Sequence, residues 1–529
     1  MSSDKNLELT WQYVDHWAAE RPDAEAVVFG GRRMSWAEFK RDMDNTAKAL
    51  LELGVQRGDR IGLVAMACPE FLTTFMAANK VGASWLGMSP KFTAAELQYM
   101  VDDCRPKVLI TQRRHDDTDL AETLSEMNLE GSSVAQILVI GEPFEGAENF
   151  ETFTGQARPH LDDPLAQRAQ SGQPGDVTLL MYTSGSTGKP KGVEQTHRSM
   201  IRNIEVEVEQ FRVDCNSRTL LHFPINHVAA DVEIGFAAIH AGATTVMMDR
   251  FDPLATLKTV EEEKITLFGQ VPAMFLLEMG LPEFGTTDFS SVQTFVWSGA
   301  AAPRQMLDVL DGIARQTGAR LLTGYGSTEV CGFVTYSAPE DGLDVLEKTA
   351  GKCAAPFEIR IADDDGNDAP PGETGEVCIR GDLLMEGYLN KPELTAAVID
   401  AEGWYHSSDL GYLDAQGNLV LCGRRSEMYK SGGENVFPRE IEEVIETHPS
   451  VMFAAVIGVP DPIFQEVGKA YVMAKPGATV PEEELKALCK DHLANFKVPK
   501  SFEIRPVLPF LPNGKVNKMA LKQELAEKG

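Results

Sequence analysis

The sequence lacks features that mark several specialised classes of protein. No stretch approaches the ~20 uninterrupted apolar residues of a transmembrane helix, and the most apolar region, 61–88, is interrupted by Pro69, Glu70 and Lys80. The eight cysteines form no Cys-x-x-Cys pair, so we expect reduced thiols rather than disulfides or a zinc site. The first residues carry charges of both signs and no apolar run, which a secretory signal would need.

Basic residues are also few. The 529 residues include 49 Lys and Arg against 79 Asp and Glu, which gives a formal net charge of −30. Nucleic-acid-binding proteins usually carry a basic stripe, and anionic membranes attract basic segments, so the acidity argues against both kinds of partner. Since no transmembrane run is present either, we expect a cytoplasmic protein without integral membrane association. The length and a hydrophobic fraction of 43% are ordinary for a globular protein of roughly three to four folding units.

Strand-like apolar runs alternate with helical periods over the first 350 residues. For example, 294–297 predicts a strand, 303–315 predicts a helix, and Ser35 and Glu38 form a capping box. This alternation predicts an α/β fold of layered sheets flanked by helices. From about residue 351, short strand-like runs separated by turn clusters predict a mainly antiparallel, barrel-like piece. No internal repeat or low-complexity segment is present in the sequence.

The strongest local motif is the segment 182–192 (YTSGSTGKPKG), which follows the apolar strand 177–181. Its glycines allow backbone N–H groups to approach a polyphosphate, while its hydroxyls donate and Lys189 and Lys191 add positive charge. It is not a Walker A loop, because Thr183 stands where that loop has its first glycine. The alternative, a flexible linker, would need neither the lysines nor the flanking strand and helix.

A second glycine-rich turn, 324–329, also follows an apolar strand. Tyr325 offers a ring on which an adenine can stack, and Thr328 can donate to a phosphate. Glu329 is a hard oxygen ligand that suits Mg²⁺. Taken alone, the segment fits an ordinary loop with a core tyrosine equally well.

Two further polar residues have chemistry that suits a nucleotide. Asp409 ends the loop segment 403–409, and a carboxylate can accept from both hydroxyls of a ribose. Lys515 lies near the C-terminus, and its compact charge can bridge a carboxylate oxygen and an α-phosphate. Taken alone, the first fits a turn cap and the second fits a surface lysine.

These motifs, in this order over nearly the whole chain, resemble those of the adenylate-forming superfamily. That superfamily contains acyl-CoA synthetases, firefly-luciferase-like enzymes and the adenylation domains of peptide synthetases. The resemblance implies a large N-terminal adenylation domain over 1–424, built of two layered α/β subdomains and a β-barrel over about 351–424. It also implies a small, mobile α+β C-terminal lid domain over 425–529. The hinge is expected near Ser426, where the family usually has Asp or Lys.

The resemblance also implies a role for each motif residue. The expected ATP-binding residues are Thr183, Ser184, Gly185, Ser186, Thr187, Gly188, Lys189, Gly299, Ala300, Ala301, Gly324, Tyr325, Gly326, Asp409 and Arg424. The expected catalytic residues are His227, Thr328, Glu329 and Lys515, with Glu329 as the metal ligand. The expected CoA-binding residues are Ser431, Gly432 and Gly433. The expected acyl-pocket residues are His227, which matches an aromatic or imidazole gate, and Val228, Ala229 and Asp231.

The implied reaction is the ATP-dependent joining of a carboxylic acid to CoA through an acyl-adenylate, with ATP, Mg²⁺ and CoA as cofactors. Many relatives have Gly where Ala230 stands, and Asp231 and Glu233 lie nearby, so we expect a narrowed or polar pocket. This favours a short-to-medium, alicyclic or aromatic acid over a long fatty chain. The two carboxylates fit a water-facing helix surface equally well.

Two other functions remain open from the sequence. The first is an adenylating enzyme with another acceptor, either a carrier-protein thiol or oxygen as in luciferases. The Ser-Gly-Gly-Glu-Asn run at 431–435 looks more like that of CoA ligases. The second is a non-catalytic nucleotide-binding protein, which we would expect to lack Lys515, Glu329 or Asp409. The oligomeric state is also open, and a homodimer is among the options.

Overall fold

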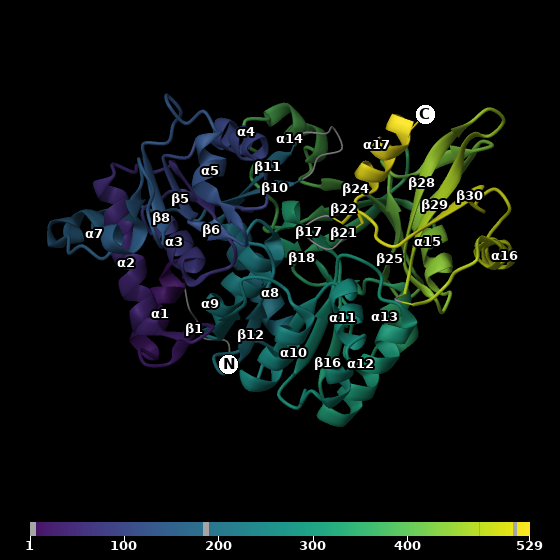
Figure 1. The fold of residues 1–529 in the computed structure, drawn as a ribbon, viewed down its shortest axis with the longest axis horizontal. Helices are drawn as coiled ribbons and strands as arrows, with labels where there is room; N and C mark the ends of the chain where they lie inside the picture. Colours follow the sequence, from purple (N-terminus) through teal and green to yellow (C-terminus); the bar gives the residue numbers. More distant parts are fainter. Residues whose placement is uncertain (1–6, 184–189, 476, 511–515, 529) are drawn as a thin grey trace.

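The computed structural model describes residues 7–183, 190–475, 477–510 and 516–528. Two large sheets organise the first 350 residues together with residues 387–398 (Figure 1), as the α/β pattern predicts. In spatial order, the seven-stranded sheet consists of β16 (Arg320–Thr323), β15 (Thr294–Trp297), β14 (Leu267–Gln270), β12 (Arg218–Leu221), β13 (Thr244–Met247), β1 (Glu25–Phe29) and β2 (Arg32–Ser35). Its strands are parallel except for the β1–β2 hairpin.

The second sheet has eight strands. In spatial order they are β23 (Gly387–Tyr388), β11 (Lys191–Thr196), β10 (Val177–Thr183), β4 (Ser84–Met88), β3 (Arg60–Val64), β5 (Val108–Gln112), β8 (Gln136–Ile140) and β9 (Glu148–Asn149). The run from β10 to β9 is parallel, whereas β10, β11 and β23 pair antiparallel. This antiparallel edge turns the 182–192 segment back on itself.

Helices cover both sheets and connect their strands. In this part they are α1 (Gln12–Glu20), α2 (Trp36–Glu52), α3 (Pro69–Lys80), α4 (Ala94–Cys104), α5 (Leu120–Ser125), α6 (Phe150–Thr154), α7 (Asp162–Gln170), α8 (His197–Phe211), α9 (Ala237–Ala241), α10 (Pro253–Glu262), α11 (Pro272–Met279), α12 (Arg304–Thr317), α13 (Leu343–Lys348) and α14 (Pro392–Val398). The capping box expected at Ser35 and Glu38 begins α2. All residues of helix α3 except Glu70 are buried, including the polar Asn79 and Lys80, so this helix lies within the core.

Short elements connect these layers. They are β6 (Arg114–His115), β7 (Thr118–Asp119), β17 (Gly326–Ser327), β18 (Gly332–Phe333), β19 (Thr335–Tyr336), β20 (Lys352–Cys353), the 3₁₀ turns η1 (Pro159–Leu161), η3 (Pro282–Thr286) and η4 (Thr328–Val330), and the π-helix η2 (Ala229–Phe236). π-Helical turns are rare and occur frequently at functional sites, which draws attention to η2.

The barrel-like piece expected from about residue 351 is a four-stranded antiparallel sheet. Its order is β21 (Glu358–Ala362), β22 (Gly375–Arg380), β24 (Tyr405–Leu413) and β25 (Leu419–Arg424). Its outer strands β21 and β25, both fully described, do not pair with each other, so the sheet stays open. Its Val377, Ile379 and Leu419 belong to an apolar cluster that extends to Val193 on β11 and to Tyr325.

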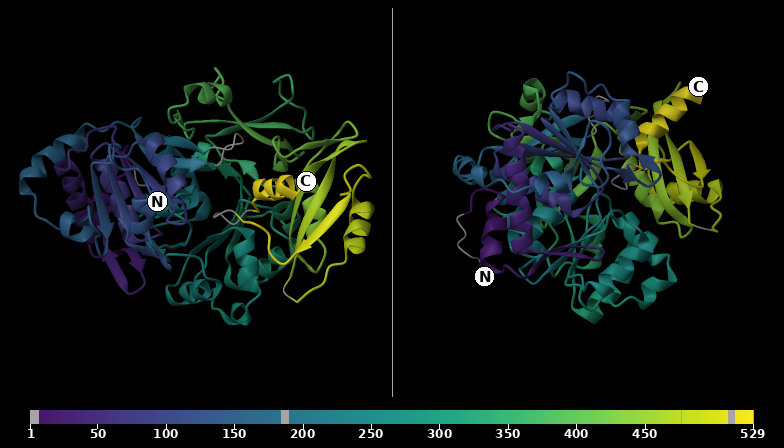
Figure 2. Two further views of the ribbon diagram at one scale, coloured as in Figure 1. Left: turned by 45° about the horizontal axis from the view of Figure 1, so that its top comes forward. Right: turned by 60° about the vertical axis from the view of Figure 1, so that its left-hand side comes forward.

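The last 100 residues form a separate layer of sheet and helices. Its strands are β26 (Tyr429–Ser431), β27 (Glu434–Val436), β28 (Val451–Asp461), β29 (Gln465–Ala474) and β30 (Ser501–Arg505), and its helices are α15 (Pro438–Glu446), α16 (Glu482–His492) and α17 (Lys518–Lys528). This unit buries its own apolar cluster around Ile441 and Val456. Figure 2 shows it in yellow tones at one end of the molecule, where Lys475 Nζ donates to Gln305 Oε1 on α12 at 2.9 Å. The boundary at 424/425 and the mobility of this unit stay predictions.

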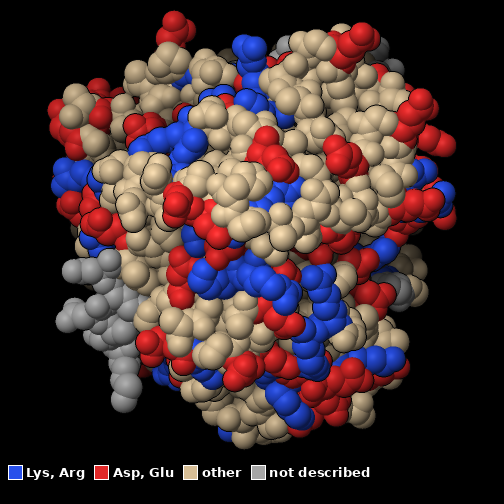
Figure 3. Space-filling model, turned by 90° about the vertical axis from the view of Figure 1, so that its left-hand side faces the viewer, with Lys and Arg blue, Asp and Glu red and all other residues tan. Residues whose placement is uncertain are grey.

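The acidic excess does not form a single-sign surface on the face drawn in Figure 3. There, Asp and Glu side chains lie next to Lys and Arg side chains. None of the described helices is both long and apolar enough to cross a membrane. The eight cysteines are all free thiols, among them the buried Cys104, Cys331, Cys378 and Cys489.

Candidate active site

The two ends of the 182–192 segment belong to one hairpin. Thr183 on β10 pairs with Lys191 on β11, and Tyr182 pairs with Gly192. The residues expected to bind phosphate between them, Ser184, Gly185, Ser186, Thr187, Gly188 and Lys189, lie outside the described residues. Tyr182 anchors the β10 end, because its hydroxyl donates to Asp103 Oδ2 at 2.7 Å.

Lys191, Tyr388 and Glu329 meet beside this hairpin. Lys191 Nζ lies 4.0 Å from the centroid of the Tyr388 ring, a cation–π contact. The Tyr388 hydroxyl donates to Glu329 Oε1 at 3.1 Å. Burial lowers the pKa of Lys191, and the Glu329 carboxylate acts in the opposite direction. Three segments thus place a cation and a carboxylate beside the expected phosphate loop.

The 324–329 turn approaches neighbouring backbone so closely that only glycine fits. A Cβ atom on Gly324 would lie 2.1 Å from the Thr335 carbonyl oxygen. On Gly326 it would lie 1.8 Å from the carbonyl oxygen of Gly332, where β17 pairs with β18. Two glycines therefore let the turn fold against the chain that follows it.

Tyr325 and Asp409, predicted to contact the same nucleotide, are hydrogen-bonded to each other. The Tyr325 hydroxyl donates to Asp409 Oδ2 at 2.6 Å, and Arg424 Nε donates to Asp409 Oδ1 at 3.1 Å. Burial, with the nearby Asp409 charge, raises the pKa of Tyr325, so the hydroxyl stays protonated as a donor. The Arg424 side chain is 56% exposed, which leaves its remaining N–H groups accessible.

The loop at 298–303 joins the same site. Ser298 Oγ donates to the Gly324 carbonyl oxygen at 3.0 Å. Gly299 has φ +86°, a left-handed conformation that favours glycine, and both Gly299 and Ala300 are exposed. Ala301 is partly buried. The structure therefore brings this loop together with the 324–329 turn.

His227 comes just before the π-helix η2. Its Nδ1 accepts from the backbone N–H of Ala229 at 3.1 Å, which holds the ring against the start of this helix. Val228 and Ala229 are buried beside it. Asp231 is fully buried rather than facing water, whereas Glu233 is partly buried. The sequence left open whether these two carboxylates lie near the pocket or on a helix surface that faces water.

A polar stripe on α8 holds the chain that follows Glu329. Ser199, Asn203 and Glu207, spaced four residues apart, lie on one face of this helix and are all buried. The Asn203 amide donates to the Val330 and Phe333 carbonyl oxygens at 3.3 and 2.9 Å.

Two more side chains bind the backbone of the segment 328–333: one at the C-terminal end of the polar stripe and one on β11, the strand before α8. Glu207 Oε1 accepts from the Phe333 N–H at 2.7 Å. Gln195, on β11, donates to the Thr328 carbonyl oxygen at 2.7 Å.

Sequence reasoning did not single out Tyr388, Gln195, Asn203 or Glu207. The i, i+4 spacing of polar residues on an otherwise apolar face of α8 is the signal that could have found the last two.

In the C-terminal unit, Gly432 and Gly433 form the two-residue turn between β26 and β27. Both have positive φ, 62° and 91°, as such hairpin turns require, so the turn itself explains the glycine pair. Ser431 is buried in β26, and Ser426 is exposed in the turn that follows β25. Lys515 lies outside the described residues. Lys518, which we did not assign to the site, is held by Glu427 and Glu442 at 2.6 and 2.8 Å.

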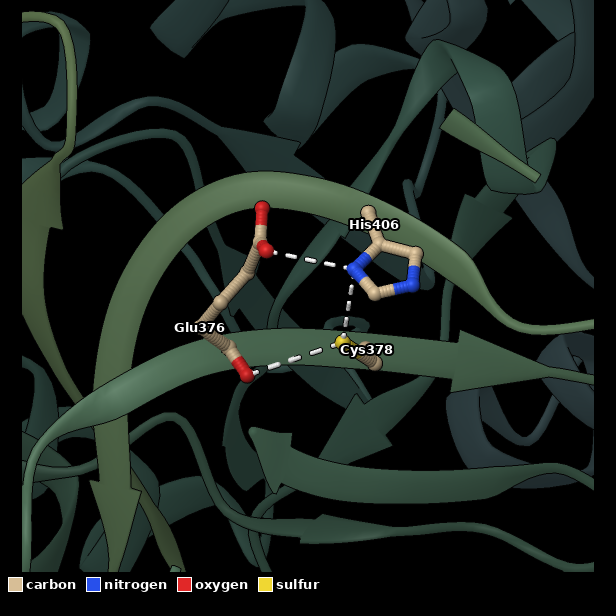
Figure 4. Close-up of side chains that lie close together, drawn as sticks. All are labelled: Glu376, Cys378 and His406. Carbon is tan, nitrogen blue, oxygen red and sulfur yellow. Dashed lines mark hydrogen bonds and ion pairs between the residues drawn. The ribbon is translucent and has the colours of Figure 1, made fainter. Parts of the chain in front are cut away.

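One group of potential metal ligands lies apart from these residues, between β22 and β24 (Figure 4). Glu376 Oε2 and Cys378 Sγ lie 3.2 and 3.4 Å from His406 Nδ1. On the other side of the ring, His406 Nε2 lies 3.3 Å from Asp400 Oδ2. Burial raises the pKa of the Cys378 thiol to about 12, which disfavours the thiolate a metal would need. We assign this group a structural role between the two strands.

Comparisons with known proteins match two separate stretches of the chain. Residues 14–389 match the family model of the AMP-binding enzymes, and residues 440–515 match that of the AMP-binding enzyme C-terminal domain. A feruloyl-CoA synthase of Amycolatopsis is 33% identical over 514 residues, 96% of this chain and 98% of the relative. An indoleacetate–CoA ligase of Aromatoleum aromaticum is 30% identical over 524 residues, 99% of each chain. A solved anthranilate CoA ligase in complex with anthranoyl-AMP has the same fold, with a TM-score of 0.88 at 24% identity over 98% of both chains.

Proposed function

Because the chain belongs to the AMP-binding enzyme family, we propose that it is an ATP-dependent carboxylic acid:CoA ligase that releases AMP and pyrophosphate. One observation carries this proposal. Contacts between side chains link the phosphate-loop hairpin to Glu329 through Lys191 and Tyr388, and link Tyr325 to Asp409 and Arg424. The polar groups that an adenine, a ribose and a triphosphate need therefore come together from distant segments.

In the first half-reaction, an oxygen of the substrate carboxylate attacks the α-phosphorus of ATP. The bond from this phosphorus to the pyrophosphate oxygen breaks, and the acyl-adenylate forms. Lys191 and the hydroxyls of the loop neutralise and orient the phosphates, Tyr325 stacks on the adenine, and Asp409 accepts from the ribose hydroxyls. We assign the α-phosphate contact to Thr328 and the bridging charge to Lys515. Positioning and charge neutralisation are the main tasks of a protein in such transfers.

Mg²⁺ fits beside Glu329. This carboxylate is partly exposed, and its Oε1 accepts from Tyr388, whereas its Oε2 has no hydrogen-bond partner among the described residues. Magnesium in nucleotide sites typically takes one or two carboxylates together with phosphate oxygens and waters. Glu329 would hold the ion, which supplies charge neutralisation on the phosphates.

In the second half-reaction, the CoA sulfur attacks the acyl carbonyl carbon. The bond from this carbon to the phosphate oxygen breaks, AMP leaves with the electron pair, and the thiol proton is transferred to the departing phosphate or to solvent. We propose that residues 425–529 act as a lid that turns about Ser426 and brings the turn of Gly432 and Gly433 to the site. The substrate is a compact acid: short-to-medium, alicyclic or aromatic.

The test is to incubate the purified protein with ATP, Mg²⁺, CoA and a panel of short, medium, alicyclic and aromatic acids. We expect AMP and thioester in equal amounts, formed only when acid and CoA are both present. Without CoA, hydroxylamine should trap the adenylate as a hydroxamate. AMP release that needs no acid would overturn the proposed function. A preference for chains beyond about twelve carbons would overturn the compact-acid assignment alone.

A further inference from the structure

Helices α8 and η2 and strand β18 meet just beyond the proposed phosphate end of the site. The chain runs from Thr328 and Glu329 directly into Gly332 and Phe333 of β18. In the same way, the chain from His227 runs into η2. Glu207 of α8 and Glu233 of η2 lie close enough that, after burial, repulsion from Glu233 is the next cause that raises the pKa of Glu207.

Several buried oxygen atoms at this meeting point have no hydrogen-bond partner among the described residues. They are Asn203 Oδ1, Glu207 Oε2 and both side-chain oxygens of Asp231, all from side chains with 0% exposure. The Asn203 amide nitrogen donates to the carbonyl oxygens of Val330 and Phe333, so it is the amide oxygen, which can only accept, that is left unpaired. Burying such atoms unpaired costs free energy, so a set of them needs an explanation.

Gly332 lets β18 approach two of these side chains, Glu207 and Asn203. A Cβ atom at this position would lie 2.4 Å from Glu207 Oε1 and 3.0 Å from Asn203 Oδ1, and its φ of +135° disfavours any other residue. No side chain at position 332 therefore covers the oxygens of Glu207 and Asn203 from the side of β18.

We propose that Asn203, Glu207, Asp231 and Glu233 form the inner end of the acid-binding pocket. They select a compact acid that carries a hydrogen-bond donor, a hydroxyl or amino group, at the end remote from the reacting carboxylate. This inference rests on the proposed function and names the substrate class within it.

A donor fits this set of atoms better than an acceptor or an apolar group. The Asn203 oxygen and the carbonyl oxygen of a neutral Asp231 carboxyl offer lone pairs that a ligand N–H or O–H would satisfy. The O–H of that carboxyl can donate to the same ligand hydroxyl or amino group. A purely structural Glu207 would need only the one oxygen that accepts from Phe333, and glutamine would supply it equally well. An apolar end would leave every one of these oxygens unpaired, and sites built to bond a hydroxyl or amino group reject analogues that lack it.

The experiment compares matched 3-phenylpropanoates whose ring carries hydrogen, methyl, hydroxyl or amino at the 3- or 4-position. Adenylate formation is measured by the hydroxamate trap, and acid binding is measured separately by the shift in melting temperature that each acid produces. We expect kcat/KM for a hydroxyl or amino acid to exceed that of its methyl counterpart by about tenfold or more. Comparison of kcat/KM between the hydroxyl-substituted and amino-substituted acids shows which of the two donors the pocket prefers.

The variants Glu207→Gln and Glu233→Gln are expected to reduce the donor-over-methyl ratio of kcat/KM about fivefold or more. Glu207→Gln keeps an acceptor for Phe333, so the fold is retained. The control Glu209→Gln removes an exposed carboxylate from the same helix and is expected to leave the ratio unchanged.

Two results separate failure of this inference from failure of the proposed function. If kcat/KM for the methyl and unsubstituted acids equals that for the donor acids, the ligase function stands and the donor pocket is overturned. If no acid is adenylated, the proposed function fails, and the melting-temperature shifts then decide the pocket. Larger shifts for the donor acids that Glu207→Gln abolishes would support the pocket, and equal shifts across the panel would overturn it.

Discussion

The hydroxyl of Tyr325 donates a 2.6 Å hydrogen bond to Asp409, a residue 84 positions further along the chain. In the proposed site, one of these residues stacks on the adenine and the other holds the ribose. The bond therefore fixes the spacing between the two parts of the adenosine site before a nucleotide enters. Arg424, on the other carboxylate oxygen, completes this arrangement.

Removing the Tyr325 hydroxyl should weaken ATP binding more than it slows the chemical step. For Tyr325→Phe, which keeps the ring, we expect KM for ATP to rise roughly 10- to 150-fold with a smaller change in kcat, because a hydrogen bond to a charged group contributes ~1.5–3 kcal/mol. Steady-state kinetics at varied ATP measure this. The control Tyr13→Phe removes a buried hydroxyl on α1, far along the chain from the site, and should leave KM unchanged. An equal rise in both variants would contradict the assignment.

Neutralising Glu329 should change the magnesium dependence of adenylation. Glu329→Gln still accepts from Tyr388 but loses the charge that we assign to metal binding. We expect kcat/KM to fall by about a hundredfold or more and the half-saturating Mg²⁺ concentration to rise, since electrostatic groups at a reacting phosphate are worth ~3–4 kcal/mol. Tyr388→Phe should have a smaller effect on both. An unchanged Mg²⁺ titration in Glu329→Gln would remove this residue from the metal site.

Lys515 should matter for one half-reaction only. We expect Lys515→Ala to slow formation of the adenylate by about a hundredfold or more, because it removes the charge that bridges carboxylate and phosphate. When the acyl-adenylate is supplied ready-made, the same variant should convert it to the CoA thioester at close to the normal rate. Single-turnover assays of each half measure this. Loss of the thioester step with normal adenylation would reverse the role.

The buried carboxyl of Asp231 should make stability depend on pH. Burial raises its pKa in the folded state well above the ordinary carboxyl range, and Glu207, Glu233 and Cys331 lie on the elements near it. A raised folded pKa contributes stability below the unfolded pKa, and this contribution is lost as pH rises through the folded value. The difference in free energy of unfolding between Asp231→Asn and the parent should therefore shift in favour of the variant as the pH rises from about 5 to about 8. Urea unfolding at both values tests this, and a constant difference would contradict it.

Lys518 should be a structural residue of the C-terminal unit. Its ammonium lies between Glu427, just after the proposed hinge, and Glu442, whose side chain is only 4% exposed. Lys518→Met leaves the buried Glu442 with only the more distant cation of Arg439, 3.8 Å away. We expect a loss of about 3 kcal/mol in the free energy of unfolding of this unit, the low end for a broken buried ion pair. Lys490→Met, at an exposed position on α16, should change it by less than about 0.5 kcal/mol. Chemical denaturation, monitored by limited proteolysis of the C-terminal unit, measures the free energy of unfolding in both variants.

Several elements could be predicted because their causes are local. The strand at 294–297 has the predicted bounds, and the predicted helix at 303–315 is α12 over Arg304–Thr317. The capping box at Ser35 involves only residues three positions apart. Periodicity, capping and glycine turns depend on near neighbours in the chain, so the sequence alone reveals them.

The motif residues were therefore determined by the sequence itself, since each motif carries its own turn and its own chemistry. Only the tertiary structure decided which groups surround them: Tyr388 beside Glu329, Tyr325 on Asp409, and Glu207 beside Glu233. These pairs join elements between 26 and 84 residues apart, so no local pattern records them. Whether a carboxyl is buried and neutral or exposed and charged depends on the elements that pack around it, and this packing exists only in the folded chain.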